Sequence, residues 1–418
     1  MGEPSLCGVV VPSRSCNSAS VTAVLEDARQ SAREYGWNVG LAYCGDASKP
    51  GTWSGTPASL GDGMRDHGAR VVPLGAQASA LVETITAHAL TLLRLPRVPG
   101  ASLMERARLS RTISLYTGSG MSVLRSRGLR ADIRRAGTLD AIVQIQTNYA
   151  VPPGVPVATF EDMTVAQAVE LPYPDWQALS RPEQAAAMDR QRRAYERASA
   201  CCFTTQWAAN SAISDYGIEP EKTHVVGVGR NHVTRPVDRD WSTPRYLFVG
   251  SNWRMKNGDA VLEAFARVRE QIPLARLDLV GAHPDVDAPG VHGHGWLSLA
   301  DDVQRRRLDE LFESATCFVL PSLCDASAIS YVEAGAAGVP SIGSAVGGSS
   351  ELIGDGGCVL DPHDHEALLT TMLHFADGDT ARAAGERARV SAERFTWPQV
   401  AQRLLSALEP HVARTRPS

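Results

Sequence analysis

Residues 321–348, PSLCDASAISYVEAGAAGVPSIGSAVGG, predict a loop, a helix and a glycine pair directly after the apolar strand expected at 317–320. The loop carries Asp325 and the helix carries Glu333. In α/β proteins, a strand that ends in a loop opening a helix commonly holds anionic ligands. Because the two carboxylates are eight residues apart, one lies at or before the helix start and the other about two turns in. This spacing suits two contacts to different hydroxyl groups of one extended ligand.

The composition is that of an ordinary globular protein of two domains. The chain has 418 residues, of which 44% are hydrophobic and 21% are charged, and a length of this order favours more than one domain. A formal charge of -5 argues against nucleic acid as a partner. The sequence contains no run of 18 apolar residues and its first residues do not resemble a signal peptide, so we expect no transmembrane segment and a cytoplasmic location.

No metal site is expected from the spacing of potential ligands. The eight cysteines form no CxxC pair and are expected to be small buried residues. His283, His292 and His294 lie close together in sequence, but no further ligands complete a tetrahedral zinc set. Asp285 and Asp287 form a DxD pattern between two prolines, and two carboxylates alone do not complete a coordination shell.

Two successive series of strand–helix units divide the chain. We expect a first domain at 1–232, a linker at 233–244, a second domain at 245–392 and a C-terminal helix at 393–418 that packs back on the first domain. Two such series predict an α/β protein with two doubly wound sheets. Strands are expected at 8–11, 37–44, 69–74, 140–145, 156–160, 201–204 and 223–228, and then at 245–249, 277–280, 317–320 and 341–343.

A basic loop at the end of the first strand of the second domain is a candidate diphosphate site. The stretch 249–258, VGSNWRMKNG, carries Arg254 and Lys256 just before a predicted helix. A diphosphate requires a positive partner that does not itself react, which lysine or arginine provides. The alternative is a solvated basic loop, and it is less favoured because the 321–348 segment is predicted at the same edge of the same sheet.

Two further loops of the first domain carry candidate polar groups. The loop at 12–18 contains Ser13, Ser15, Asn17 and Ser18, which could face a phosphate or an acceptor, although helix capping alone would also explain them. The stretch 159–164, TFEDMT, places Glu161 and Asp162 after a strand, where one of them could orient an acceptor hydroxyl or the donor sugar. The alternative there is a helix cap plus a surface charge.

An arginine-rich region at 97–135 has two interpretations. It could contact an anionic partner, or it could form a solvated helix face, which is the more common role of such a run.

The sequence resembles the retaining glycosyltransferases of the GT-B fold, specifically family 4. The resemblance is carried by YLFVGSNWRMKNGDAVLEAFARVREQIPLARLDLVG at 246–281 and by PSLCDASAISYVEAGAAGVPSIGSAVGGSSELI at 321–353, and more weakly by TTQWAANSAISDYGIEPEKTHVVGVGRN at 204–231. It implies two Rossmann-like domains that face each other across a cleft. It also implies a metal-independent enzyme without a cofactor, which uses a nucleotide-diphosphate sugar as co-substrate.

The resemblance implies roles for individual residues. Lys256 would bind the donor diphosphate with help from Arg254, while Ser251 stands where the family usually has an arginine. Glu333 would bind the nucleotide ribose, and Asp325 would contact hydroxyls of the transferred sugar. The donor would also lie against the backbone of Ala326, Ser327 and Ala328, with its base near His294, Gly295 and Trp296.

The chain departs from the family pattern at three places. Asp325 replaces a glutamate, Ala326 replaces a glycine, and the catalytic-side histidine of the first domain is replaced around Glu161. The predicted function is transfer of a sugar to an acceptor hydroxyl, with retention at the anomeric carbon. Two alternatives are a nucleotide-sugar epimerase of the same fold and a non-catalytic nucleotide-sugar-binding relative. The acceptor, the donor base and sugar, and the oligomeric state stay open.

Overall fold

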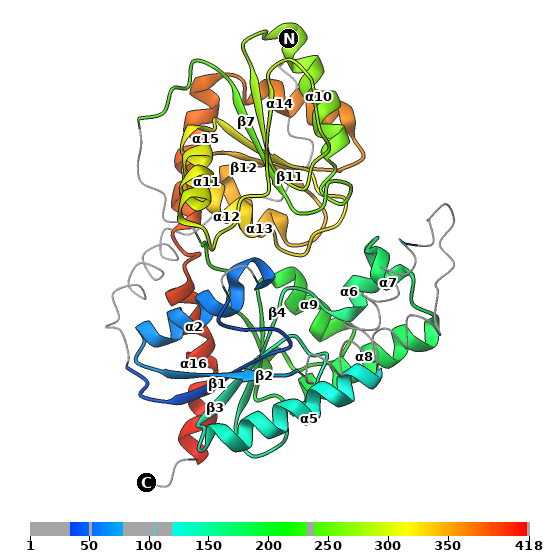
Figure 1. Cartoon of the computed structure of the whole chain (residues 1–418), viewed down its shortest axis with the longest axis vertical. Helices are drawn as coiled ribbons and strands as arrows, with labels where there is room; N and C mark the ends of the chain where they lie inside the picture. The colour runs from blue at the N-terminus through cyan, green and yellow to red at the C-terminus, as the bar shows by residue number, and fades with distance from the viewer. Residues whose placement is uncertain (1–33, 50–51, 78–103, 105–118, 232–237, 416–418) are drawn as a thin grey trace.

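The computed structural model describes residues 34–49, 52–77, 104, 119–231 and 238–415. It contains two six-stranded sheets, and the helices lie around each sheet in two separate lobes (Figure 1). The predicted strand at 8–11 and the loop at 12–18 lie outside the described residues. No described helix combines the length and the apolar character needed to cross a membrane.

The sheet of the first lobe is parallel, with strand order β2-β1-β3-β4-β5-β6. The central strands β3, β4 and β5 are buried at every residue, which explains their continuous apolar character. The strands are β1 Asn38–Tyr43, β2 Arg70–Gly75, β3 Ala141–Ile145, β4 Val157–Glu161, β5 Ala200–Phe203 and β6 Thr223–Val225.

Helices of the first lobe connect these parallel strands, as right-handed crossovers require. Two carry side-chain capping boxes that fix where they begin: Thr164 with Gln167, and Ser180 with Glu183. The helices are η1 Thr52–Gly55, α2 Thr56–Asp66, α5 Ser119–Ala136, α6 Val165–Glu170, α7 Pro174–Gln177, α8 Arg181–Arg197, α9 Gln206–Ser214 and η2 Pro220–Lys222.

The sheet of the second lobe is also parallel, with order β12-β11-β10-β7-β8-β9. Its order reverses between β7 and β10. In open α/β sheets, ligands bind at the carboxyl ends of the strands at such a point. The strands are β7 Arg245–Gly250, β8 Arg276–Gly281, β9 Val291–Gly295, β10 Cys317–Leu320, β11 Ser341–Ser344 and β12 Gly357–Leu360.

Helices pack against the faces of this second sheet and complete the lobe (Figure 1). The helix α10 has its N-cap at Asn257, which adopts a left-handed conformation with φ of 62° that asparagine tolerates better than most residues. The helices are α10 Gly258–Gln271, α11 Asp302–Ser314, α12 Ile329–Ala336, α13 Ser349–Ile353, η3 Gly354–Gly356, α14 His365–His374 and α15 Gly378–Ala392.

The last helix, α16 Trp397–Thr415, returns from the second lobe and packs against α2 of the first (Figure 1). Two glycines make the close approach at its start possible, because a Cβ at Gly63 or Gly229 would overlap Trp397. The ring nitrogen Nε2 of His67 is 2.9 Å from the backbone oxygen of Pro398. The first residues of the helix are therefore fixed to the first lobe by backbone-level contacts.

The strands predicted from the sequence within the described residues are confirmed, with shifts of a few residues at their ends. Two strands were not predicted. β9 has the sequence VHGHG and β12 has GCVL, and both contain glycine and are only partly buried. Edge strands of this kind lack the continuous apolar run on which the prediction relied.

Residues 238–244 are packed against the second lobe and do not form a free connection. The Arg239 guanidinium donates hydrogen bonds to the carbonyls of Glu313 and Phe312 near the end of α11, and to those of Ala337 and Gly338 after α12. Carbonyls at helix C-termini lack intrahelical partners and carry partial negative charge, so a cation satisfies them well. Burial lowers the pKa of Arg239 to about 10.

Replacing Arg239 by alanine should destabilise the second lobe by about 2 kcal/mol, because four carbonyls lose their charged donor. Thermal unfolding of the purified variant would measure this change. Arg389→Ala, on an exposed face of α15, is the matched control and should stay within about 0.5 kcal/mol of the parent protein. Equal melting temperatures for the two variants would show that the Arg239 contacts contribute nothing.

Candidate functional site

A cavity of about 490 Å³ lies between the two lobes and receives residues from both. We call it the interdomain cavity. Its second-lobe wall is built by the loops after β7 and β10 and by the start of α12, at the carboxyl edge of the second sheet. The polar residues lining it include Ser54, Asp162, Thr204 and Asn231 from the first lobe, and Ser251, Lys256, Ser298, Asp325, Ser327, Ser330 and Glu333 from the second.

Lys256 and Asp325 form an ion pair in this cavity. They come from the loops after β7 and β10, which are neighbouring strands of the sheet. Their side chains are 15% and 14% exposed, so the pair is largely withdrawn from water. A partly buried charge pair is screened less by salt than an exposed one. The cavity therefore contains a positive group beside a negative group, both with capacity for further polar contacts.

Close backbone packing fixes the two loops that carry this pair. Gly347 has a φ of +74°, and a Cβ there would overlap the backbone oxygen of Asp325. Gly281, with a φ of +101°, packs in the same way on the backbone of Gly250. Only glycine combines these φ values with such close approach at low cost. The loops are therefore held by contacts that tolerate no side chain.

Glu333 is buried, at 6% exposure, and lies on the second turn of α12. Its Oε1 accepts a hydrogen bond of 3.3 Å from the backbone nitrogen of Asn231 of the first lobe. The Asn231 side chain donates to the carbonyl of Ser54 and accepts from the Trp397 indole nitrogen at 3.0 Å. This asparagine thus connects the Glu333 carboxylate, the first lobe and the start of α16.

The N-terminus of α12 opens onto the interdomain cavity. Its N-cap is Ala328, which provides no side-chain cap, and Ala328, Ile329 and Ser330 all line the cavity. The first N–H groups of a helix have no intrahelical acceptor and lie at the positive end of the helix dipole. An anionic or polar ligand in the cavity could accept hydrogen bonds from them.

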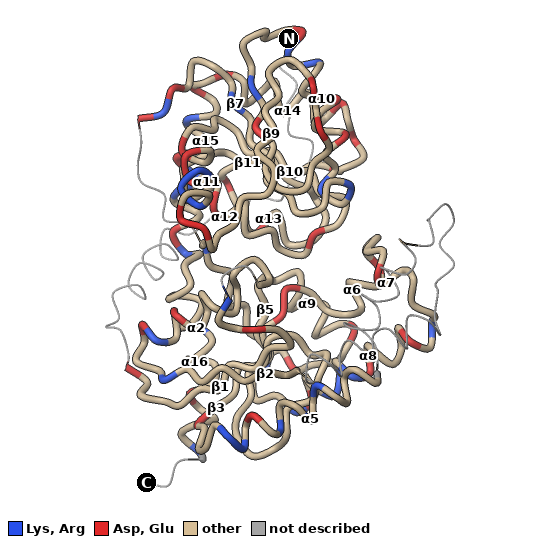
Figure 2. The backbone as a smooth tube through the Cα atoms, viewed as in Figure 1, with Lys and Arg blue, Asp and Glu red and all other residues tan. Residues whose placement is uncertain are grey.

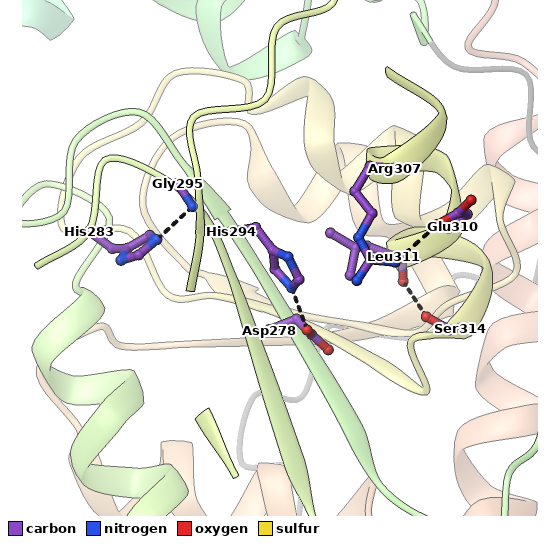
Figure 3. Close-up of polar contacts among 8 residues, drawn as sticks. All are labelled: Asp278, His283, His294, Gly295, Arg307, Glu310, Leu311 and Ser314. Carbon is purple, nitrogen blue, oxygen red and sulfur yellow. Dashed lines mark hydrogen bonds and ion pairs between the residues drawn. The ribbon is translucent and has the colours of Figure 1, made fainter. Parts of the chain in front are cut away.

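The far side of the cavity is bounded by the segment after β9, and Figure 3 shows polar contacts of the β9 residues that precede this segment. His294 Nε2 lies 2.6 Å from Asp278 Oδ1, and the Gly295 backbone nitrogen donates to His283 Nε2 at 3.0 Å. Trp296 follows these residues, lines the cavity and is 65% exposed. An exposed aromatic ring at a cavity edge offers a flat face for stacking.

A second cavity, of about 240 Å³, lies in the first lobe, and we call it the side cavity. Asp162 lines both cavities, so the two adjoin at this residue. The side cavity is otherwise bounded by the end of β4, by α7 and by α8. Its polar and aromatic lining residues are Gln146, Thr147, Asn148, Glu161, Asp162, Thr164, Asp175, Trp176, Arg190 and Gln191.

Burial raises the pKa of both adjacent carboxyl groups, Glu161 and Asp162. The Glu161 side chain is 5% exposed, and burial together with the neighbouring Asp162 charge raises its pKa to about 8. Burial and the negative charge of Asp325 raise the pKa of Asp162 to about 6. Perturbed carboxyls of this kind cluster at functional sites more often than elsewhere.

The structure brings together most, but not all, of the residues predicted from the sequence. Lys256, Asp325, Glu333, Ser251, Trp296, Ser327, Ala328 and Asp162 line the interdomain cavity. Arg254 is exposed and outside the lining, because the turn from Asn252 to Asn257 directs only Lys256 toward Asp325. Gly295, Ala326 and Glu161 also lie outside it. Ser13, Ser15, Asn17 and Ser18 lie outside the described residues.

Three residues near the site gave no signal in the sequence. Asn231 ends the first lobe, and burial, together with the charges of Asp325 and Asp162, raises the pKa of Tyr173. Glu351 accepts hydrogen bonds from the backbone nitrogens of Gln206 and Trp207, at 2.6 and 2.8 Å, and so caps α9 from the opposite lobe. A contact between lobes leaves no local pattern from which it could be predicted.

A larger groove of about 990 Å³ lies between α5 and α8, away from the second lobe. Basic residues follow both helices in Figure 2. The arginines that line the groove are Arg127, Arg130, Arg190, Arg193 and Arg197. The described part of the arginine-rich region thus forms the helix α5 with basic residues facing this groove.

Comparisons with known proteins agree with this architecture. Residues 243–377 match the family model described as glycosyl transferases group 1. The D-inositol 3-phosphate glycosyltransferase of Xylanimonas cellulosilytica is 26% identical over 264 residues, which covers 56% of this chain and 60% of that protein. The O-antigen chain mannosyltransferase B of Escherichia coli is 28% identical over 169 residues, which covers 38% of this chain and 44% of that protein. The chain thus spans about 60% or less of these curated relatives.

Solved structures share the fold. Sucrose-phosphate synthase from Thermosynechococcus elongatus has a TM-score of 0.63 at 17% identity, covering 91% of this chain and all of that one. WaaG, a glycosyltransferase involved in lipopolysaccharide biosynthesis, has a TM-score of 0.61 at 19% identity, covering 89% of this chain and 99% of that one. These likenesses confirm the predicted two-domain GT-B fold.

Replacing Glu161 by glutamine should change how stability depends on pH. In the unfolded chain the carboxyl group of Glu161 loses its proton near the ordinary pKa of 4.5, whereas in the folded protein its pKa is raised to about 8. Between these values the folded state binds more protons, so the parent protein loses stability as pH rises. Glu161→Gln removes that loss, and we expect its stability relative to the parent to increase by about 3.5 kcal/mol from pH 5 to pH 8.

Melting temperatures of both proteins at several pH values would measure this effect. The matched control is Glu170→Gln, at the exposed end of α6. A stability difference from the parent that is the same at pH 5 and at pH 8 would contradict the buried, protonated state of Glu161.

Proposed function

We propose that this chain is a group 1 glycosyltransferase, on the basis of the family match over its second lobe. It would transfer a sugar from a nucleotide-diphosphate donor to an acceptor hydroxyl. One observation carries the proposal. Lys256, Asp325 and Glu333 meet at the carboxyl edge of the second sheet, in a cavity that first-lobe residues close from the other side. A cation, two carboxylates and an uncapped helix N-terminus together match the charges and hydroxyls of a nucleotide sugar.

The donor diphosphate would lie between Lys256 and the N-terminus of α12. Lys256 provides a full positive charge, and the first N–H groups of α12 provide directed hydrogen bonds. Negative charge develops on the diphosphate as the glycosidic bond breaks, and preorganised donors of this kind stabilise it in the transition state. The exposed ring of Trp296 would stack against the base at the other end of the cavity.

The two carboxylates would bind hydroxyl groups at different positions of the donor. Glu333, on the second turn of α12, would accept from the ribose, and Asp325, in the preceding loop, would accept from the transferred sugar. Ionised carboxylates are acceptors only, and each can take several hydrogen bonds. Asp162, across the cavity, would orient the acceptor hydroxyl.

The reaction would proceed with retention at the anomeric carbon. The acceptor oxygen forms a bond to that carbon, the bond between the carbon and the diphosphate oxygen breaks, and the hydroxyl proton leaves with the diphosphate. Chemistry at the boundary of two lobes requires that water be kept out, because water would otherwise hydrolyse the donor. Direct contacts near the cavity, such as Thr204 Oγ1 to Ser327 Oγ at 3.2 Å, support a closed arrangement.

The proposal includes a reaction without a bound metal and a cytoplasmic location. Within the described residues, no three or more His, Cys, Asp or Glu side chains are grouped so that they could hold a metal ion. The comparisons favour neither the epimerase nor the non-catalytic alternative.

The direct test supplies the purified protein with a panel of nucleotide sugars and acceptors in excess EDTA. Thermal shift identifies the donor, because a ligand that binds only the folded state raises the melting temperature. Turnover that needs both donor and acceptor, with a product of the donor's own anomeric configuration by NMR, is the expected result. Conversion of the donor without an acceptor would indicate an epimerase, donor binding without turnover a non-catalytic protein, and loss of activity in EDTA a metal requirement.

Lys256→Ala should lower kcat at least about a hundredfold, equivalent to about 2.7 kcal/mol of transition-state stabilisation. The reason is that the developing charge on the diphosphate loses its cationic partner. Steady-state kinetics with the donor identified above would measure it. Lys222→Ala is the matched control, because this half-buried lysine lies on η2, outside the lining of the interdomain cavity, and donates to the Glu196 carbonyl.

Glu333→Ala separates binding from chemistry in the same assay. Loss of a ribose contact should raise the donor KM about tenfold, or about 1.4 kcal/mol, with a smaller effect on kcat. An unchanged donor KM would show that Glu333 does not contact the ribose. A folded Lys256→Ala variant with normal kcat would show that Lys256 does not stabilise the diphosphate.

A further inference from the structure

The side cavity is a second ligand-sized space that the donor does not fill. At about 240 Å³ it lies just below the range of roughly 300–1,000 Å³ typical of sites for drug-sized ligands, so it suits a ligand of about one sugar ring. It adjoins the interdomain cavity at Asp162. A ligand in the side cavity could therefore present one hydroxyl group toward the anomeric carbon of a donor.

Three residues with carboxyl groups and one arginine line this cavity. The carboxyls are Glu161, Asp162 and Asp175, and the guanidinium belongs to Arg190. When the carboxyls are ionised, the lining has a net negative charge. Burial raises the pKa of all three carboxyl groups, including that of Asp175, because it removes water that would solvate their charged forms.

Glu161 provides an observation independent of this charge count. Its side chain is 95% buried, and its Oε1 atom has no hydrogen-bond partner among the described residues, although the side chains of Thr147 and Gln191 hydrogen-bond to the same carboxyl group. A buried acceptor without a partner costs about 1–3 kcal/mol, so native proteins rarely keep one without a reason. A ligand that donates to this atom would remove the cost.

The lining indicates what kind of donor group the ligand carries. An ammonium group has three N–H donors and a positive charge, and it satisfies a buried carboxylate better than a hydroxyl does. Trp176 lines the same cavity, and an aromatic face also attracts a cation. A neutral polyol would bring no positive charge to balance the three carboxyl groups, which outnumber the one arginine of the lining.

We propose that the side cavity is the acceptor site and that it selects a monosaccharide-sized acceptor with a protonated amino group, such as an amino sugar or an aminocyclitol. The ammonium group lies among Glu161, Asp175 and Trp176, and the accepting hydroxyl lies at Asp162. This inference rests on the proposed transferase function only in assigning the bound sugar as the acceptor of the transfer. Binding of the cationic ligand itself is independent of turnover.

Calorimetric titration with glucosamine, glucose and N-acetylglucosamine tests the proposal at pH 6.5, where the glucosamine amine is protonated. The three probes share a ring and differ in one substituent. Glucosamine should bind at least tenfold more tightly than either neutral probe, with or without a nucleoside diphosphate present. Equal or tighter binding of a neutral probe, or no binding of glucosamine in either condition, would overturn the proposal.

Variants locate the binding within the molecule. At pH 6.5 the Glu161 carboxyl is protonated and releases its proton when the ammonium group binds. Asp175→Asn and Glu161→Gln therefore each remove one carboxylate that the bound ammonium group needs, and each should weaken glucosamine binding about tenfold while leaving nucleoside diphosphate binding unchanged. Glu170→Gln is the control for a carboxyl outside the cavity. If Glu161→Gln folds poorly, Asp175→Asn still decides the question, because Asp175 is only half-buried. Unaltered glucosamine binding in folded Asp175→Asn would place the ligand elsewhere.

Turnover then separates failure of this inference from failure of the proposed function. Transfer to glucose or N-acetylglucosamine in preference to glucosamine leaves a transferase with a neutral acceptor, and the inference fails. Selective glucosamine binding without transfer from any nucleotide sugar leaves the site in place, and the transferase proposal fails.

Discussion

Parallel pairing of β10 with β7 sets the position of Lys256, of Asp325 and of the start of α12 in the interdomain cavity. The two strands are adjacent in the sheet although about 70 residues separate them along the chain, as the register of Cys317 with Tyr246 shows. Both strands end at the same edge, so the loops that follow them lie side by side. This is why Lys256 and Asp325 form an ion pair, and why α12 begins at the cavity instead of on the far side of the sheet.

The second lobe alone does not complete the site, because the contacts that close it come from the first lobe and from α16. Asn231 connects the Glu333 carboxylate to Ser54 and to Trp397. Glu351 caps α9 across the lobe boundary, where its charge is favourable at the positive end of a helix. The return of α16 onto α2 ties the second lobe to the first by a second covalent connection. Relative movement of the lobes therefore has to break specific hydrogen bonds, not only apolar contacts.

The sequence predicted those parts of the structure that depend on local pattern. The apolar strands, the helix of Glu333 and the basic loop of Lys256 follow from periodicity and spacing, and residues 243–377 match the model of glycosyl transferases group 1. Arg254 and Lys256 could not be told apart, because a turn decides which of two nearby cations faces the cavity. β9 was missed because VHGHG has no apolar alternation. Contacts between lobes, such as those of Glu351, depend on tertiary placement alone.

Two carboxylates of opposite lobes, Asp162 and Asp325, face each other at the lobe boundary. Burial and the charge of Asp325 raise the pKa of Asp162, so the ionised forms of the two groups repel each other across the cavity. Lys256 is the one lysine or arginine side chain in the described lining, and it is paired with Asp325. A diphosphate that draws Lys256 toward itself would strengthen this repulsion unless hydroxyl groups of a sugar lay between the two acids. The arrangement therefore favours simultaneous occupation of both sides of the boundary, because each ligand supplies the donors that the facing carboxylates lack.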